Sequence, residues 1–247
     1  MAYYNFLNII FAPLLRLPVL WAVIILSFIV SIVIIIITKY TTDQALMKKL
    51  KDDMKEYQKQ VKELKGNPAK AMEVQKKAME VNMKYMMHSL KPTIITFIPI
   101  ILIFGWMSST FAYDGIKPNE VFSVTAFFDN ANGEAGLTVP EGMTLVDEKT
   151  KKFENSQATW NLKGEEGEHI LEFNYNGDKQ QKDVLIASTG KYIEPVKKTN
   201  GKIKSIKINY NSRKILNLFG WKLGWLGTYI ISSIIFTMSL RKLLKVY

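Results

Sequence analysis

The sequence predicts an α-helical membrane protein with three transmembrane helices, a cytoplasmic antiparallel coiled-coil hairpin and an extracellular β-rich, sandwich-like domain. Three observations predict this fold class: three long apolar blocks, a lysine-rich stretch between the first two, and alternating strand-like runs before the third. We therefore expect seven segments: an interfacial amphipathic helix (1–17), a first span (18–38), the cytoplasmic hairpin (39–91), a second span (92–113), the extracellular β-domain (114–212), a third span (213–240) and a cytoplasmic tail (241–247).

The apolar blocks are long enough to cross a membrane. Residues 19–37 carry no charge, and a helix of that length crosses a hydrocarbon core of ~30 Å. Residues 92–113 contain no ionisable group except Tyr113. Residues 215–240 contain a single charged residue, Lys222. A signal peptide is excluded because only Arg16 precedes a first block that already has full span length.

Lysine and arginine are concentrated on one side of the first two blocks. Five basic residues follow the first block closely and one precedes it, whereas four precede the second block and one follows it. This bias predicts that residues 39–91 are cytoplasmic, in a multi-pass plasma membrane protein with its N-terminus outside and its C-terminus inside. Residues 3–15 place apolar side chains at helical spacing, which favours a helix lying in the membrane interface over a frayed terminus.

The composition excludes most catalytic chemistry. The 247 residues carry 33 basic and 22 acidic side chains, a net charge of +11, and 48% are hydrophobic. There is no cysteine, which excludes thiol nucleophiles, disulfides and thiolate metal sites. The two histidines, His88 and His169, lie too far apart in the sequence for a histidine metal cluster. We expect no enzyme activity, no cofactor and no metal ion.

Residues 39–91 show the spacing of two helices that pair. Apolar residues follow a 3-4 spacing on both sides of a break at Gly66, Asn67 and Pro68. This segment holds 13 lysines against 7 acidic residues. The pairs Lys48, Lys49 and Lys76, Lys77 are candidates to contact ribosomal phosphates, and a solvated coiled-coil surface is the alternative.

Methionine is concentrated in the same segment, which holds seven of the 11 in the chain. Thioether side chains adapt to varied apolar partners, so a methionine cradle could receive diverse hydrophobic segments. Packing in the helix seam explains some of these residues equally well, but not the group next to the second span. The candidate cradle consists of Met79, Met83, Met86 and Met87.

Residues 114–212 read as a small antiparallel β-domain. Alternating runs near residues 121–127, 158–162, 169–175, 182–186 and 203–208 are separated by turn signals such as Asn132-Gly133. They contain no nucleophile–base pair, phosphate loop or metal-ligand spacing, and we interpret His169 as a strand-surface residue.

Polar side chains inside the apolar blocks predict a groove. Lys222 would lie in the outer leaflet if the third span begins near Ile215, and would be an interfacial anchor if it begins at Leu223. A bundle of three spans has little interior, so these side chains need a wet indentation or a partner, although hydroxyls also bond back to their own helix. The predicted groove residues are Lys222, Ser108, Ser109, Thr110, Ser232, Ser233 and Thr237.

Several stretches resemble the archaeal YidC-like proteins of the Oxa/YidC membrane insertase superfamily, to which the third subunit of the eukaryotic ER membrane protein complex is related. They are LPVLW at the start of the first span, PIILIFGW (99–106) in the second and LNLFGWK (216–222) at the opening of the third. The resemblance implies an insertase whose hairpin docks on translating ribosomes and whose groove holds a basic residue, at Lys222. Bacterial relatives carry an arginine inside the first span, whereas here only Arg16 or Lys39 flanks it.

The resulting expectation is a membrane protein insertase or chaperone that receives hydrophobic nascent chains from ribosomes and inserts them through a polar groove. Its partners would be the ribosome, nascent membrane proteins and the lipid bilayer, with a further membrane subunit left open. The alternative is a membrane-anchored sensor or scaffold whose extracellular β-domain binds a ligand.

Overall fold

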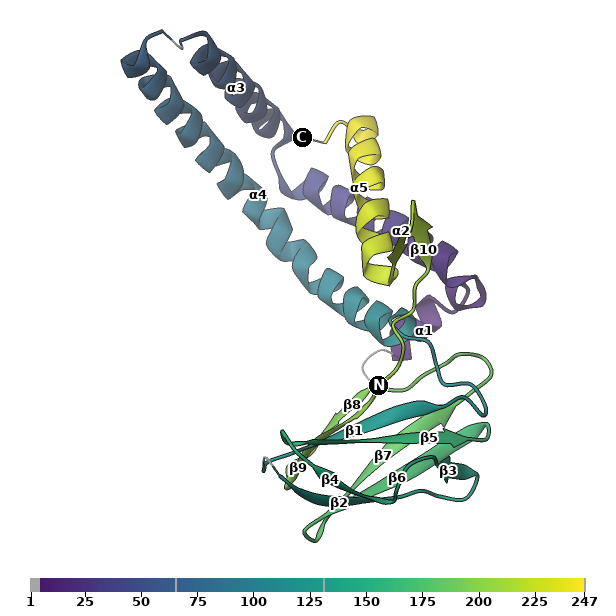
Figure 1. Cartoon of the computed structure of the whole chain (residues 1–247). Coiled ribbons are helices and arrows are strands. Elements are labelled where there is room, and N and C mark those ends of the chain that lie inside the picture. The colour runs from purple at the N-terminus through teal and green to yellow at the C-terminus, as the bar shows by residue number, and fades with distance from the viewer. Residues whose placement is uncertain (1–4, 65, 131, 247) are drawn as a thin grey trace. The chain divides into compact units, whose positions relative to one another are not determined.

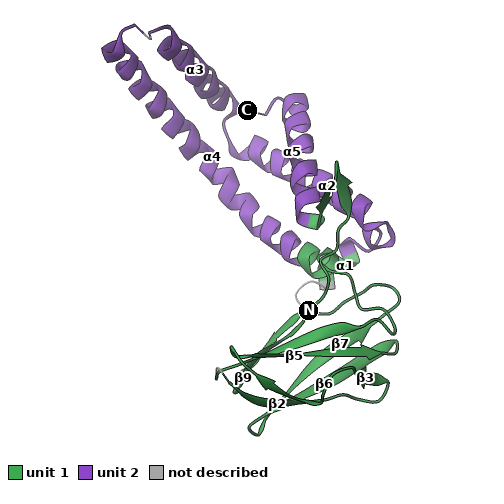
Figure 2. Cartoon of the chain, viewed as in Figure 1, with its two compact units in different colours: residues 1–9, 106–225 green, residues 10–105, 226–247 purple. Residues whose placement is uncertain are grey.

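The computed structural model describes residues 5–64, 66–130 and 132–246 and divides into two compact units. One unit combines residues up to Ile9 with residues 106–225, and the other combines residues 10–105 with residues 226 onward (Figure 2). The helices are α1 (Asn5–Ile10), the short 3-10 helix η2 (Leu14–Arg16), α2 (Val19–Thr41), α3 (Gln44–Glu63), α4 (Pro68–Phe111) and α5 (Trp225–Leu244). Figure 1 labels the five α-helices.

Two described helices are long and apolar enough to cross a membrane, α2 and α4. The predicted second span is not a separate element, because it continues the second hairpin helix as the single 44-residue helix α4. Pro92 and Pro99 lie inside this helix. Since proline has no N–H, each leaves the carbonyl four residues earlier without its helical hydrogen bond.

Side-chain caps fix where α3 and α4 begin. The Asp43 carboxylate accepts hydrogen bonds from the backbone N–H of Ala45 and Leu46, at 2.9 and 3.0 Å. The Asn67 side chain accepts one from the N–H of Lys70 at 3.2 Å, and Pro68 occupies the first helical position. The predicted break at residues 66–68 therefore separates two helices, while their pairing as a coiled coil stays a prediction.

Two expected helices differ in the structure. The segment 1–17 contains two short pieces, α1 and η2, separated at Pro13, and residues 1–4 lie outside the described residues. The expected third span at 213–240 is wrong in its first part, because residues 216–223 form a β-hairpin and α5 begins only at Trp225. A turn at Phe219 and Gly220, with φ of 50° and 95°, reverses the chain there.

The predicted antiparallel β-domain is confirmed. One sheet has the strand order β3-β5-β1-β9-β8 and the other the order β4-β2-β6-β7. All strand pairs within these sheets are antiparallel. The strands are β1 (Phe122–Phe128), β2 (Gly133–Thr138), β3 (Met143–Leu145), β4 (Thr150–Phe153), β5 (Gln157–Gly164), β6 (Gly167–Tyr175), β7 (Asp178–Ile186), β8 (Val196–Lys198) and β9 (Ile203–Ile208), followed by the hairpin β10 (Leu216–Leu218) and β11 (Trp221–Leu223).

One apolar core joins the two sheets. Alternate residues of β5 and β6 are buried, as expected for strands with one face on a core. Trp160 of one sheet and Phe173 of the other are fully buried and meet edge to face, with ring centroids 5.6 Å apart. The contact holds the two layers together as a sandwich.

A tryptophan at the end of α4 belongs to the same unit as the β-domain. Trp106 is fully buried, and its indole N–H donates a hydrogen bond of 2.7 Å to the Asn8 side chain. This bond satisfies the indole N–H and ties α1 to α4.

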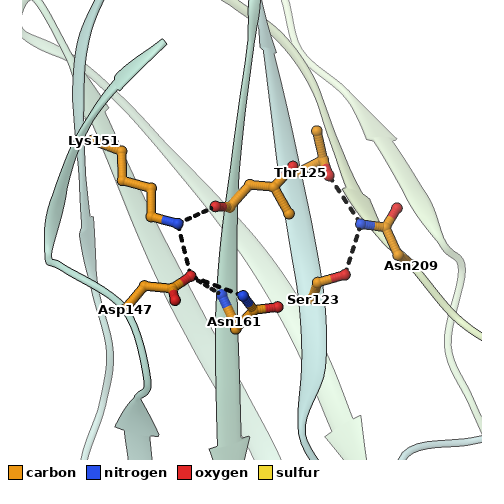
Figure 3. Close-up of polar contacts among 7 residues, drawn as sticks. Ser123, Thr125, Asp147, Lys151, Asn161 and Asn209 are labelled. Atoms are coloured by element: carbon orange, nitrogen blue, oxygen red, sulfur yellow. Dashed lines mark hydrogen bonds and ion pairs between the residues drawn. The ribbon is translucent and has the colours of Figure 1, made fainter.

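A polar network lies on the face of the first sheet (Figure 3). The Asp147 carboxylate accepts hydrogen bonds from the Lys151 ammonium at 2.7 Å and from the Asn161 backbone N–H at 2.8 Å. These donors, Lys151 first, hold the pKa of Asp147 below its ordinary value. On the same face, the Asn209 amide donates to the hydroxyls of Ser123 and Thr125.

We expect the Asp147→Asn substitution to destabilise the β-domain by about 1–3 kcal/mol at neutral pH, because it weakens charge-assisted bonds to partly buried donors. The carboxylate pKa is lowered on folding, so its contribution is present above the unfolded value, near 3.9, and is lost as the pH falls. The difference in the free energy of unfolding between wild type and variant should therefore disappear below about pH 4. Pulse proteolysis of the full chain in urea measures it.

The matched control is Asp129→Asn, at an exposed position directly after β1. We expect a change within about 0.5 kcal/mol at every pH. A loss for Asp147→Asn that does not vary with pH would show that the carboxylate charge is not what stabilises this network.

Candidate functional site

The helices α2, α4 and α5 pack through aromatic and small side chains. Phe28 of α2 meets Phe236 of α5 edge to face at 5.1 Å, and Phe104 of α4 meets Tyr229 of α5 in the same way at 4.8 Å. Ser31 of α2 is buried, and its hydroxyl lies 3.5 Å from that of Thr237 on α5. Small residues let helices approach closely in lipid, which fits these contacts.

A polar hollow opens between these helices at the end of α2. Its volume is about 120 Å³. Thr38 and Thr42 line it from the end of α2, and Ser89, Thr93 and Thr96 line it from α4. The remaining lining residues are Ile34, Met47, Tyr85, Pro92 and Arg241. We call this hollow the polar groove.

The hydroxyl groups of the polar groove donate hydrogen bonds to their own helices. Thr38 bonds the Ile34 carbonyl at 2.8 Å, and Thr93 bonds the Ser89 carbonyl at 2.8 Å. Thr42, Ser89 and Thr96 make equivalent bonds to carbonyls three or four residues earlier. Because each hydroxyl proton is used, the remaining lone pairs of these oxygens make the wall a set of acceptors.

Arg241 supplies the cation of the polar groove. It lies in the last turn of α5, and its buried Nε has no hydrogen-bond partner among the residues that the structure describes. A guanidinium only donates hydrogen bonds, so it complements a wall of acceptor oxygens and can also bind an entering carboxylate or carbonyl. Unpaired buried donors are rare and call for an explanation.

Sequence reasoning missed Arg241, which we had assigned to the cytoplasmic tail. A signal was present, because Ser233, Thr237 and Arg241 are spaced four residues apart and therefore share one face of a helix. All three are partly buried in the structure. Reading the apolar block as ending at Leu240 hid this polar stripe.

An apolar hollow between α2 and α4 borders the polar groove. This second hollow has a volume of about 50 Å³, and Ile34 and Thr96 line both. The other side chains around it include Val33, Ile37 and Ile103. Ile34 and Thr96 therefore border a polar hollow on one side and an apolar hollow on the other.

None of the seven predicted groove residues lines the polar groove. Lys222 is exposed on β11, paired with Asn217, and so precedes the third apolar helix instead of lying within it. The hydroxyls of Ser109 and Thr110 bond back to the Trp106 carbonyl, each at 2.8 Å, and the Ser108 carbonyl accepts a bond from Tyr192. On α5, Ser233 bonds back to the Ile230 carbonyl, Thr237 reaches Ser31, and Ser232 is partly buried.

The predicted methionine cradle is exposed on α4. Met79, Met83, Met86 and Met87 are between 50% and 66% exposed, so they do not pack in a helix seam. Apolar residues at three- and four-residue spacing extend this row in both directions along the same helix face. The complete row, which we call the α4 stripe, contains Met72, Met79, Met83, Met86, Met87, Leu90, Ile94, Phe97, Ile98 and Ile101.

The four candidate ribosome-contacting lysines are exposed on α3 and α4. Lys77 forms an ion pair with Glu73 at 2.9 Å, and this pair raises the pKa of Lys77 and lowers that of Glu73. Both partners are exposed, so the pair leaves the local surface basic without fixing the lysine tightly.

The β-domain contains its own hollow beside β7, of about 940 Å³. Lys182 is almost fully buried next to it, and its ammonium donates to the carbonyl oxygens of Asp183 and Glu194. Burial lowers the pKa of Lys182. His169 also lines the hollow and contacts the Glu165 carbonyl, in keeping with a strand-surface role. Within the described residues, no group of three His, Asp or Glu side chains could hold a metal ion.

Comparison with known proteins identifies the family. Residues 8–132, just over half of the chain, match the family described as integral membrane protein EMC3/TMCO1-like. That family belongs to the Oxa1/YidC/Alb3 insertase-related superfamily and is linked to membrane protein insertion, while a specifically archaeal YidC-like assignment stays a prediction. Neither a curated protein nor a solved structure matches the chain. The chain is therefore a member of the EMC3/TMCO1-like family of integral membrane proteins.

Proposed function

We propose that this protein is an insertase of the plasma membrane that moves short hydrophilic segments across the bilayer and releases the adjoining apolar segment into lipid. The polar groove with Arg241 is the observation that carries this proposal. Three spans, α2, α4 and α5, surround the groove, and the chain has its N-terminus outside and its C-terminus in the cytoplasm. No covalent chemistry takes part.

The groove lowers the main cost of insertion, which is the transfer of hydrophilic groups out of water. Acceptor oxygens and one guanidinium replace part of the hydration shell of a client loop, while the apolar hollow beyond Thr96 shortens the hydrophobic path. Burial of about 20 apolar client residues in lipid then makes the overall transfer favourable without ATP.

Arg241 takes the role that the resemblance implied for Lys222. Lys222 is exposed on a hairpin before α5, whereas Arg241 lies among the groove hydroxyls. α2 lacks the arginine that bacterial relatives carry in their first span, and a guanidinium reaching the groove from α5 offers the same charge. Its planar donors suit client carboxylates and carbonyls.

The α4 stripe is the proposed receiving surface for apolar client segments. Its methionines lie on the cytoplasmic part of α4, and its isoleucines continue along the same helix into the apolar part. A hydrophobic segment bound to the flexible thioethers can therefore move along one helix face without crossing a polar surface. We propose that clients arrive from translating ribosomes that dock on the basic surface of α3 and α4.

Groove hydration is tested by reactivity of introduced thiols in this cysteine-free chain. We expect Thr93→Cys, in the groove, to react with a charged thiol reagent about tenfold faster than Ile94→Cys, because a thiolate forms in water and not in lipid. Ile94 is the matched control, since it is 68% exposed but belongs to the apolar α4 stripe. Equal rates in vesicles would show that the groove is dry.

The Arg241→Ala substitution should reduce insertion of a client with an acidic translocated loop by about tenfold or more, because a charge-assisted hydrogen bond contributes ~1.5–3 kcal/mol. Arg241→Lys should lose less, since it keeps the charge but not the planar donors. Protease protection of the client in proteoliposomes measures insertion. The control, Lys242→Ala at the exposed neighbour, should keep full activity. Equal losses at both positions would disprove a groove role for Arg241.

A photocrosslinking amino acid at Met83 should capture the hydrophobic segment of a ribosome-stalled nascent chain. Lys84 is the matched control, because it is exposed on the same helix turn but lies off the α4 stripe. We expect adducts at position 83 to exceed those at position 84 about threefold or more, as contact with apolar clients follows the stripe. Equal capture at both positions argues against a receiving face.

Ribosome docking is tested by reversing the charge of Lys48, Lys49, Lys76 and Lys77 to glutamate. Co-sedimentation of the full-length protein with ribosomes at low salt should fall about tenfold or more, because contacts to phosphate are electrostatic. A variant with the same charge change on the β-domain, at the exposed Lys149, Lys152, Lys163 and Lys198, should sediment as wild type does. If both variants lose binding equally, attraction is nonspecific.

A further inference from the structure

The hairpin β10–β11 is an amphipathic element that the insertase function does not use. Its register pairs Leu216 with Leu223 and Leu218 with Trp221, so these four apolar side chains share one face. Asn217 pairs with Lys222 on the opposite face. One face of this short ribbon is therefore wholly apolar and the other wholly polar.

The apolar side chains of this hairpin are strongly exposed. Phe219 at the tip is 100% exposed, Trp221 is 74% exposed and Leu218 is 39% exposed. An isolated two-stranded hairpin is at best marginally stable in water, and aromatic side chains of this size are normally covered. The hairpin therefore needs an apolar environment outside the chain.

Phe219, at the tip of the hairpin, is an unusual residue for its backbone conformation. Phe219 and Gly220 both have positive φ, 50° and 95°, as in a type I′ turn. Asparagine followed by glycine is the favoured pair for this turn, whereas phenylalanine is a rare residue at positive φ. Backbone strain of this kind persists where it serves function, so the aromatic ring at position 219 points to a contact made by the ring itself.

We propose that the hairpin is a membrane-interface anchor that inserts Phe219 and Trp221 into the lipid bilayer at the boundary between headgroups and acyl chains. Gly224 alone separates the hairpin from α5, the proposed third span, so chain continuity places the hairpin at a membrane surface. Tryptophan prefers this boundary, and the exposed Lys222 and Lys214 can reach lipid phosphates.

The backbone of the hairpin is suited to that depth. The Ile215 N–H donates to the Leu223 carbonyl at 2.9 Å, and the Gly220 N–H donates to the Asn217 side chain at 3.1 Å. These bonds, together with the strand ladder, satisfy polar groups that would otherwise oppose entry into the headgroup region. The proposal rests on the chain being a membrane protein and is independent of insertase activity.

The test places a fluorophore on single cysteines of the full-length protein in vesicles of phosphatidylcholine with a minority of phosphatidylglycerol. Three positions are labelled in turn: Phe219→Cys at the hairpin tip, Lys152→Cys on the exposed edge of the β-domain and Ile29→Cys on α2. The quenchers are lipids that carry a nitroxide either near the headgroup (shallow) or deep in the acyl chain. We expect at least about twofold more quenching at position 219 than at position 152. Shallow nitroxides should quench the label at position 219 more strongly than deep ones do, and deep nitroxides should be the stronger quenchers at position 29.

A second variant tests the effect of the Phe219 ring while the turn conformation is kept. Phe219→Asn creates the preferred turn pair and keeps the hairpin folded while removing the aromatic side chain. A label at Leu218→Cys, which leaves Trp221 in place, should lose about half or more of its shallow quenching when Phe219→Asn is added. Quenching at position 219 no greater than at 152 overturns the proposal. Blue-shifted emission without lipid quenching also overturns it, in favour of a protein that covers the tip.

Discussion

The structure of the helical unit depends on one constraint: polar side chains between few helices must be satisfied without a large protein interior. The threonine and serine hydroxyls around the polar groove meet it by bonding to carbonyls of their own helices. The guanidinium of Arg241 is the exception, because its buried Nε lacks a hydrogen-bond partner among the described residues. In the proposed function, water or a client segment in the groove supplies the missing partner.

The long helix α4 joins this constraint to the rest of the molecule. One of its faces carries the groove residues Ser89, Thr93 and Thr96, and another carries the exposed α4 stripe. Because the helix is continuous from Pro68 to Phe111, the two faces keep a fixed angular relation over its whole length. In the proposed function, a client would therefore present its apolar and its polar parts to this one helix at the same time.

Periodicity alone was enough to predict the elements with a clear pattern. Alternation located β1, β5, β6, β7 and β9, and uncharged length located α2 and the apolar half of α4. The prediction of a helix over the whole third apolar block was wrong because an apolar run does not distinguish a strand from a helix. In addition, Phe219-Gly220 is not a residue pair that indicates a hairpin turn. Of the two positions left open for Lys222, the one inside the third span is wrong, because α5 begins three residues later, near the alternative start at Leu223.

The candidate site was harder to predict than the fold because it depends on which hydroxyls share a hollow. Ser109 and Thr110 were predicted for the groove, and Thr93 and Thr96 in the same apolar block were not, yet only the latter pair lines it. Sequence position in an apolar block does not reveal helix rotation about its axis. Arg241 was excluded from consideration by its place at the end of the third block, where a basic residue is ordinary.

Lys182 gives the β-domain a property suited to its proposed surroundings. β7 is the last strand of its sheet, and a long outer strand normally invites pairing with any extended chain. The buried Lys182 side chain, held by the carbonyls of Asp183 and Glu194, puts a desolvated charge at this edge. An intruding strand would have to displace that ammonium, which disfavours pairing of another extended chain with this edge of the sheet.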